Sequence, residues 1–125
     1  MMGYKHSFFL CYTPFMFLEN DKLLFDAAME GAYTSYLDYP VFLGEDEINQ
    51  RATRYAQDIC LETALEFSEI YQNGWAAGYL LVCEFVQEDE ELIREQASVI
   101  TSYSRSKALQ LVKSLLKRAL SKQVM

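Results

Sequence analysis

The sequence has few of the side chains from which small catalytic and metal sites are built. Histidine occurs once, at His6, and the three cysteines, Cys11, Cys60 and Cys83, are far apart. A single histidine excludes the di-iron bundle pattern, which requires two Glu-x-x-His motifs. An odd number of separated cysteines argues against a disulfide framework and against a zinc ribbon. We therefore expect no metal, no cofactor and buried thiols in a reducing cytosol.

Proline and glycine are also scarce, at two and five residues of 125, which excludes collagen-like and low-complexity chains. The sequence contains no P-loop, no EF-hand loop and no G-x-G-x-x-G motif. Hydrophobic residues make up 51% of the chain and aromatic residues 14%, which is too much apolar surface for a disordered protein. Residues 1–125 are therefore predicted to form a single helical domain with one core.

Acidic residues are absent from the C-terminal part of the chain. All 18 lie between Glu19 and Glu95, whereas six of the 11 basic residues follow Ser104. Residues 1–104 carry a formal charge of −13, from five bases and 18 acids, and residues 105–125 carry +6. An acidic body repels phosphates, so we expect no direct nucleic-acid binding. Attraction between the two parts is expected within one chain or between two copies.

Long apolar runs are absent as well. The N-terminal run over residues 7–18 is interrupted by Pro14 and is followed at once by Glu19, Asn20 and Asp21. A membrane-spanning helix needs about 20 apolar residues, so this run is too short. We expect a cytoplasmic protein with no membrane role.

Hydrophobic spacing predicts a mostly α-helical protein, a compact bundle of about five helices joined by short loops. Residues 4–18 are aromatic and almost uncharged, and they fit either an extended strand or a short helix. The next helix is expected to begin after Asn20 or Asp21 as its N-cap and to end near Leu37, before Tyr39-Pro40.

The clearest helical pattern covers residues 45–73, where apolar residues recur at spacings of three and four. Asn73-Gly74 is predicted to end this helix as its C-cap. Residues 75–87 are nearly all apolar and fit either a buried helix or a central strand. We favour the helix, because the neighbouring segments are helical and no second strand is present for pairing.

Two more helices are predicted in the C-terminal part. The first opens with the acidic residues 88–91, which complement the positive end of the helix dipole. Its buried side is expected to consist of Leu92, Ile93, Gln96, Val99, Ile100 and Tyr103. A break over residues 102–106 precedes the basic C-terminal helix 105–122, which has apolar residues on one side and bases on the other.

Carboxylates on the predicted helices are the strongest candidates for a partner-binding surface. They fall in two groups, one in the second half of the helix 45–73 and one at the start of the helix that opens at residue 88. Aromatic residues near helix ends are further candidates. Such residues either lie at the edge of the core or anchor an interface, and the sequence pattern does not distinguish the two roles. The candidate partner-binding residues are Glu62, Glu66, Glu69, Glu88, Asp89, Glu90, Glu91, Trp75, Tyr36 and Tyr39.

These features predict a non-enzymatic intracellular protein–protein interaction module, such as an adaptor, a regulator or an inhibitor. The partner is expected to be another protein with a basic surface, and the opposite charges of the two parts of the chain also favour a homo-oligomer. One specific alternative is an inhibitor whose carboxylates mimic nucleic-acid phosphates against a basic partner.

A second alternative comes from two acidic runs. Residues 61–66, Leu-Glu-Thr-Ala-Leu-Glu, and residues 89–95, Asp-Glu-Glu-Leu-Ile-Arg-Glu, resemble the metal-binding helices of all-α nucleotide pyrophosphohydrolases of the MazG type. The resemblance implies Mg²⁺-dependent hydrolysis of a nucleoside triphosphate, with the metal held by carboxylates of both helices. The sequence departs from the family at Ser98, where an aspartate would complete the metal site.

Overall fold

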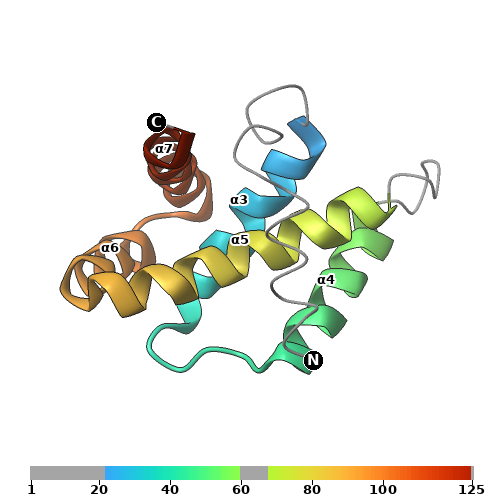
Figure 1. Ribbon diagram of the computed structural model, residues 1–125, viewed down its shortest axis with the longest axis horizontal. Coiled ribbons are helices and arrows are strands. Elements are labelled where there is room, and N and C mark those ends of the chain that lie inside the picture. Colours follow the sequence, from blue (N-terminus) through green and yellow to red (C-terminus); the bar gives the residue numbers. More distant parts are fainter. Residues whose placement is uncertain (1–21, 60–67, 125) are drawn as a thin grey trace.

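The computed structural model describes residues 22–59 and 68–124, which form five α-helices and no strand. The helices are α3 (Lys22–Asp38), α4 (Glu45–Ile59), α5 (Ser68–Glu88), α6 (Glu90–Ser102) and α7 (Arg105–Val124) (Figure 1). The prediction of a mostly α-helical bundle is therefore confirmed. The N-terminal segment 4–18, for which the sequence fits both a strand and a helix, lies outside the described residues.

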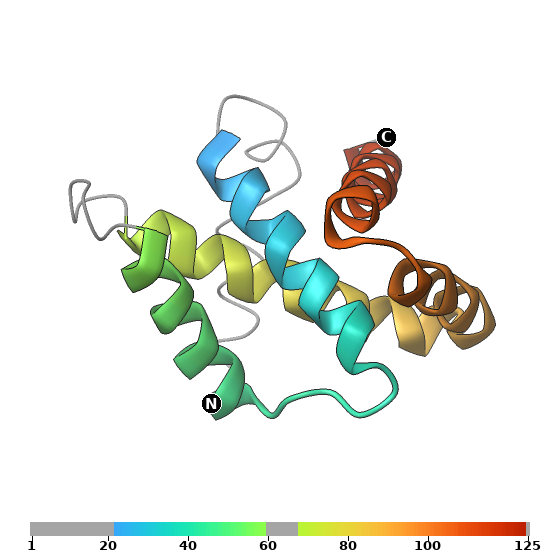
Figure 2. The same cartoon turned by 180° about the vertical axis from the view of Figure 1, so that it is seen from behind.

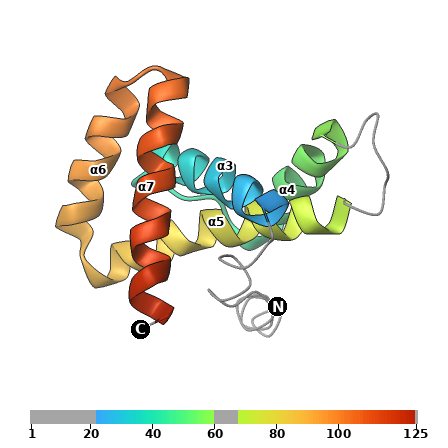
Figure 3. The same ribbon diagram turned by 90° about the horizontal axis from the view of Figure 1, so that it is seen from above.

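α5 is the central helix of the arrangement. α3 crosses it, and α4 packs against the half of α5 in which that helix begins (Figures 1 and 2). α6 and α7 form an antiparallel helical hairpin at the other end of α5, and α7 also packs against α3 (Figure 3). The hairpin and α4 therefore lie toward opposite ends of α5.

The crossing of α3 and α5 depends on two glycines, one on each helix. A β-carbon on Gly31 would lie 1.9 Å from the carbonyl oxygen of Trp75, and one on Gly78 would lie 1.9 Å from the carbonyl oxygen of Ala28. Real β-carbons do not approach a backbone oxygen so closely. The two backbones are therefore in direct contact, which only a residue without a side chain permits at these points.

The prediction of one helix over residues 45–73 is wrong. α4 ends at Ile59 and α5 begins at Ser68, and the two helices pack against each other. The side-chain amide of Gln72 donates to Thr53 Oγ1 at 2.9 Å, across 19 positions of sequence. In one straight helix these residues would lie about 28 Å apart. Both helices have helical spacing, so periodicity alone does not distinguish one helix from two.

The predicted C-cap at Asn73-Gly74 is also wrong, because both residues lie inside α5. A β-carbon on Gly74 would lie 2.6 Å from the carbonyl oxygen of Leu24 in α3, so this glycine admits a neighbouring helix and does not end its own. Residues 75–87 are helical as predicted. Residues 75–82 are all buried, because α3, α4 and α6 pack around α5.

Capping side chains define the two helices of the hairpin. The carboxylate of Asp89 accepts a hydrogen bond from the backbone N–H of Leu92 at 3.1 Å and caps α6. The hydroxyl of Ser104 accepts from the backbone N–H of Lys107 at 3.4 Å, in the first turn of α7. The prediction that the acidic run 88–91 opens one helix is therefore wrong, because Glu88 ends α5, Asp89 is the cap, and Glu90 and Glu91 begin α6.

The first residue of α7 attaches the hairpin to α3. Arg105 Nη2 donates to both carboxylate oxygens of Glu30, at 2.8 and 2.7 Å. Its guanidinium also lies over the ring of Tyr33, 5.6 Å from the centroid. Because Arg105 is exposed, solvent screens this ion pair, and its main effect is to orient α7 on α3.

The cysteines were predicted to be buried thiols. Cys83 is half-buried on α5, with its Sγ 3.9 Å from the Oγ of the buried Ser35 on α3. Cys11 and Cys60 lie outside the described residues.

A buried tyrosine joins α5 to the loop between α3 and α4. Tyr79 is fully buried, and its hydroxyl donates to Asp38 Oδ2 at 2.7 Å and accepts from the backbone N–H of Leu43 at 2.8 Å. Its ring stacks on Trp75, with 5.6 Å between centroids, and meets the edge of the Phe42 ring at 6.2 Å. The hydroxyl thus satisfies two polar groups at the edge of the core.

Replacing Tyr79 by phenylalanine is expected to lower the free energy of unfolding by about 1–3 kcal/mol, because the carboxylate of Asp38 and the N–H of Leu43 lose a shared partner. Urea denaturation followed by circular dichroism measures the change. The matched control is Tyr103→Phe at an exposed position, with an expected change of about 0.5 kcal/mol or less. Equal stability of Tyr79→Phe and the wild type would contradict a structural role for the hydroxyl.

Candidate protein-binding groove

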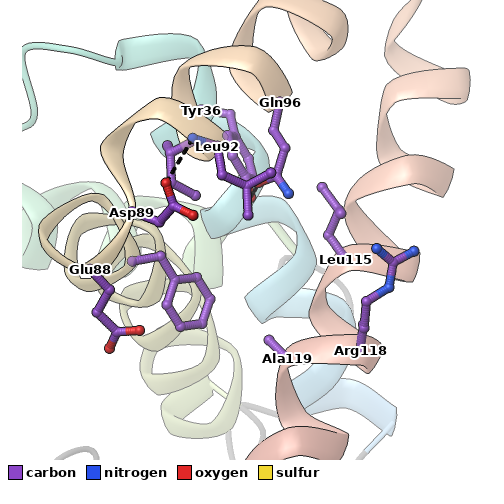
Figure 4. A pocket seen from close by; sticks show the side chains of 10 residues that line it. Tyr36, Glu88, Asp89, Leu92, Gln96, Leu115, Arg118 and Ala119 are labelled. Carbon is purple, nitrogen blue, oxygen red and sulfur yellow. Dashed lines mark hydrogen bonds between the residues drawn. The ribbon is translucent and has the colours of Figure 1, made fainter.

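A groove of about 530 Å³ lies between the α5–α6 junction and α7 (Figure 4). Its apolar surface comes from three helices, with Phe85 on α5, Leu92 and Ile93 on α6, and Leu115 on α7. The complete lining consists of Tyr36, Phe85, Glu88, Asp89, Leu92, Ile93, Gln96, Leu115, Arg118 and Ala119. Such a hollow, apolar inside and polar at its edges, is typical of a site that receives an apolar side chain.

The two rims of the groove carry opposite charge. Glu88 and Asp89 stand on the side of the α5–α6 junction, and Arg118 stands on the α7 side (Figure 4). Within the described ranges 22–59 and 68–124, neither carboxylate forms an ion pair with Arg118. The groove therefore remains open between an acidic rim and a basic rim, and both rims face solvent.

An apolar stripe runs along the exposed side of α6. Leu92 is 46% exposed, Val99 40% and Tyr103 37%, although all three were expected to be buried. Leu92 and Val99 are seven residues apart and lie on one side of α6, and Tyr103 is the residue at which the helix ends. The neighbouring side of α6 carries Ile93 and Ile100, which are buried against the bundle. The predicted burial is therefore correct for these two residues and wrong for the three residues of the stripe.

The facing side of α7 continues this apolar surface. Ala108, Val112 and Leu116 are buried and fix α7 to the bundle. Leu111 and Leu115 are only partly buried, and Leu115 lines the groove. We name the exposed and half-buried apolar residues on the two helices the hairpin seam: Leu92, Val99, Tyr103, Leu111 and Leu115.

The predicted carboxylates do not form one surface. Glu62 and Glu66 lie outside the described residues. Glu69 is in the first turn of α5 and Glu88 is its last residue, so the two are separated by about 28 Å of helix. Among the described carboxylates of the prediction, Glu88 and Asp89 are those that line the groove.

The rest of the second carboxylate group lies beside the groove. Glu90 and Glu91 are exposed in the first turn of α6, where they complement the helix dipole. Glu90 Oε2 also accepts a hydrogen bond from the hydroxyl of Tyr39 at 3.0 Å. Tyr39 thus links the loop after α3 to the acidic end of α6.

The other two predicted aromatic residues belong to the interior. Trp75 is buried against Tyr79, so the described structure gives it the role of a core residue. Tyr36 is buried at the base of the groove, and its hydroxyl donates to Gln96 Oε1 at 2.7 Å. Burial raises the pKa of Tyr36 above its usual range, so this hydroxyl remains a hydrogen-bond donor at neutral pH.

The metal site implied by the pyrophosphohydrolase resemblance falls partly outside the described residues, because Glu62 and Glu66 belong to it. Among the residues that are described, no three His, Cys, Asp or Glu side chains lie close enough together to hold a metal ion. Ser98, where the family has aspartate, is an exposed residue of α6.

Arg118, Phe85 and the seam residue Leu115 line the groove but are absent from the sequence-based candidates. One signal could have indicated the α6 stripe. The apolar residues of α6 extend from Val99 and Leu92 through Ile93 to Ala97, an arc of about 160° on a helix of 3.6 residues per turn. Such an arc exceeds one contact face, so part of it must be exposed or covered by another molecule.

No protein-family model, no curated protein and no solved structure matches the chain. None of the helices in the described part combines the length and the hydropathy that a transmembrane span requires. The function is therefore argued from the groove itself.

Proposed function

We propose that the chain is a non-enzymatic protein-binding module that receives an apolar segment of another protein in the groove between α6 and α7. One observation carries the proposal: an open apolar groove lies between an acidic and a basic rim that do not pair with each other. Exposed apolar surface of this kind costs solvation free energy, which a bound partner recovers. The flanking charges then select and orient that partner.

The acidic rim supports a partner that carries basic residues. Glu91 and Glu95 are exposed and four residues apart, so they lie on one side of α6, and the exposed Glu88 is the last residue of α5. A basic surface on the partner would meet these carboxylates while its apolar segment enters the groove. The same carboxylates support the narrower function of an inhibitor that presents them in place of nucleic-acid phosphates.

The test is a capture experiment with matched variants. Tagged wild-type protein is expected to retain a stoichiometric partner from its native host, and Leu92→Glu is expected to weaken that retention at least about tenfold, because a charge then occupies the apolar groove. Leu92 is 46% exposed, so the substitution leaves the fold intact. Affinity capture followed by mass spectrometry and by titration of the retained protein measures the effect.

Ile59→Glu is the matched control, since Ile59 is an exposed apolar residue at the end of α4, away from the hairpin. This variant is expected to retain the partner as the wild type does. Equal retention by Leu92→Glu, or loss of the partner from both variants, contradicts a binding site in the groove.

A further inference from the structure

The groove has a hydrogen-bond donor at its base, beneath the apolar walls. The hydroxyl of the buried Tyr36 donates to Gln96 Oε1 at 2.7 Å, which fixes the oxygen of this side-chain amide. The amide nitrogen points away from that hydrogen bond, into the groove and toward Leu115 on α7 (Figure 4). Within the described part of the chain no group accepts a hydrogen bond from this nitrogen. A molecule in the groove would therefore cover a polar donor as well as apolar surface.

The donor at the base selects among apolar side chains. An aliphatic side chain placed over it would leave a buried N–H without an acceptor, which is costly. Tyrosine has an apolar ring and an acceptor at its tip. We propose that the groove receives a tyrosine side chain of the partner protein, with its ring against Phe85, Leu92 and Leu115 and its hydroxyl oxygen accepting from Gln96. The inference rests on the proposed function, because it specifies what enters the same groove.

Arg118 supports the same occupant from the α7 rim. In the described part of the chain its guanidinium forms no ion pair and lies over no aromatic ring. Two other bases of α7 do lie over tyrosine rings, Arg105 over Tyr33 at 5.6 Å from the centroid and Lys107 over Tyr103 at 4.6 Å. A cation attracts the electron-rich face of a ring, so a tyrosine in the groove would give Arg118 the same kind of contact.

The acidic rim favours a basic residue beside that tyrosine. Glu88 and Asp89 line the groove on the side opposite Arg118, and neither forms an ion pair with it (Figure 4). A lysine next to the tyrosine in the partner's sequence would be attracted to these carboxylates, whereas an acidic neighbour would be repelled. The occupant is therefore a tyrosine with a basic neighbour.

Peptide binding to the full chain tests the proposal. The probes are acetyl-Lys-Tyr-amide and acetyl-Lys-Phe-amide, which differ by one hydroxyl. The tyrosine peptide is expected to bind at least about fivefold more tightly, because only its hydroxyl accepts from Gln96. Nuclear magnetic resonance titration measures the two dissociation constants, which for such short peptides are expected to be about millimolar.

Two variants isolate the contribution of the donor. Gln96→Leu removes the amide and is expected to bind both peptides equally. Because this change leaves the buried hydroxyl of Tyr36 without its acceptor, the double variant Tyr36→Phe with Gln96→Leu repeats the test with both polar groups removed, which is expected to cost little stability. Circular dichroism verifies that each variant is folded.

A matched pair of variants on α7 tests the contact of the ring with a base. Arg118→Leu is expected to weaken the binding of both peptides about threefold, because each contains an aromatic ring. Lys113→Leu is the control, since Lys113 is an exposed base about 140° around the helix from Arg118. This variant is expected to bind both peptides as the wild type does.

Equal binding of the two peptides by the wild type, or binding of neither below about 10 mM, overturns tyrosine as the occupant. A tyrosine preference that survives in the double variant also overturns the proposal, because Gln96 is then not the donor. If one of these results accompanies loss of the captured partner on Leu92→Glu, the protein-binding function stands and only the occupant is wrong. Equal retention of the captured partner by Leu92→Glu contradicts the function itself.

Discussion

Replacing Gly78 by alanine is expected to lower the free energy of unfolding by about 3 kcal/mol or more. The added β-carbon would lie 1.9 Å from the carbonyl oxygen of Ala28 and 2.6 Å from its carbonyl carbon. These are backbone atoms of a packed helix, so no side-chain rotation relieves the overlap. α3 and α5 must move apart, and the core that surrounds their crossing loses contacts.

Gly31→Ala repeats the test from the other helix, because its β-carbon would lie 1.9 Å from the carbonyl oxygen of Trp75. Gly44→Ala is the matched control, since nothing lies within 4 Å of a β-carbon at that position. Urea denaturation followed by circular dichroism and by Trp75 fluorescence measures all three variants. A loss below about 1 kcal/mol for both Gly31→Ala and Gly78→Ala would show that the two helices do not cross in this contact.

Raising the pH above about 10 is expected to unfold the protein, because buried tyrosines must lose a proton. Tyr79 and Tyr36 are both buried, and burial raises the pKa of each above its usual range. For Tyr79 the hydrogen bond to Asp38 and the charge of that carboxylate raise the pKa further, while the N–H of Leu43 opposes the shift. The folded protein therefore keeps protons that the unfolded chain releases.

The sign follows from proton binding in the two states. Above pH 10 the unfolded state binds fewer protons than the folded state, so the free energy of unfolding falls as the pH rises. Each fully buried tyrosine contributes up to about 1.4 kcal/mol per pH unit in this range and nothing below it. Two such residues would remove several kcal/mol between about pH 10 and 12, which is comparable with the whole stability of a small domain.

Circular dichroism and tyrosinate absorbance recorded together across this pH range measure the effect. We expect the ionisation of the last tyrosines to coincide with the loss of helix. Tyr36→Phe removes one buried hydroxyl and should reduce the pH dependence of the unfolding free energy by about 1.4 kcal/mol per unit relative to the wild type. Full ionisation of the tyrosines in a protein that remains helical would contradict the burial of Tyr36 and Tyr79.

The sequence predicted several elements correctly because their signals are local. Residues 75–87 were predicted as a buried helix from their uninterrupted apolar character, and they form most of α5. The spacing of apolar and basic residues after Ser104 indicated the helix that the structure shows as α7. Helix periodicity is a property of neighbouring residues, so it is readable without knowledge of the fold.

The sequence-based predictions are wrong where the role of a residue depends on a distant part of the chain. Gly74 resembles a helix terminator in sequence, but in the structure it admits the backbone of α3. Leu92 and Ile93 are adjacent and similarly apolar, yet one is 46% exposed and the other buried. Arg118 was one base among six, and only its place opposite Glu88 and Asp89 makes it part of the groove.

The helical class and the separation of charge between the acidic body and the basic C-terminal helix were determined by the sequence alone, since both depend on composition and spacing along the chain. The tertiary structure decided which apolar residues stay exposed as the hairpin seam and which carboxylates face Arg118. Burial and proximity are set by the helices that pack against each side chain, and the close crossing of α3 and α5 lies at the centre of that packing.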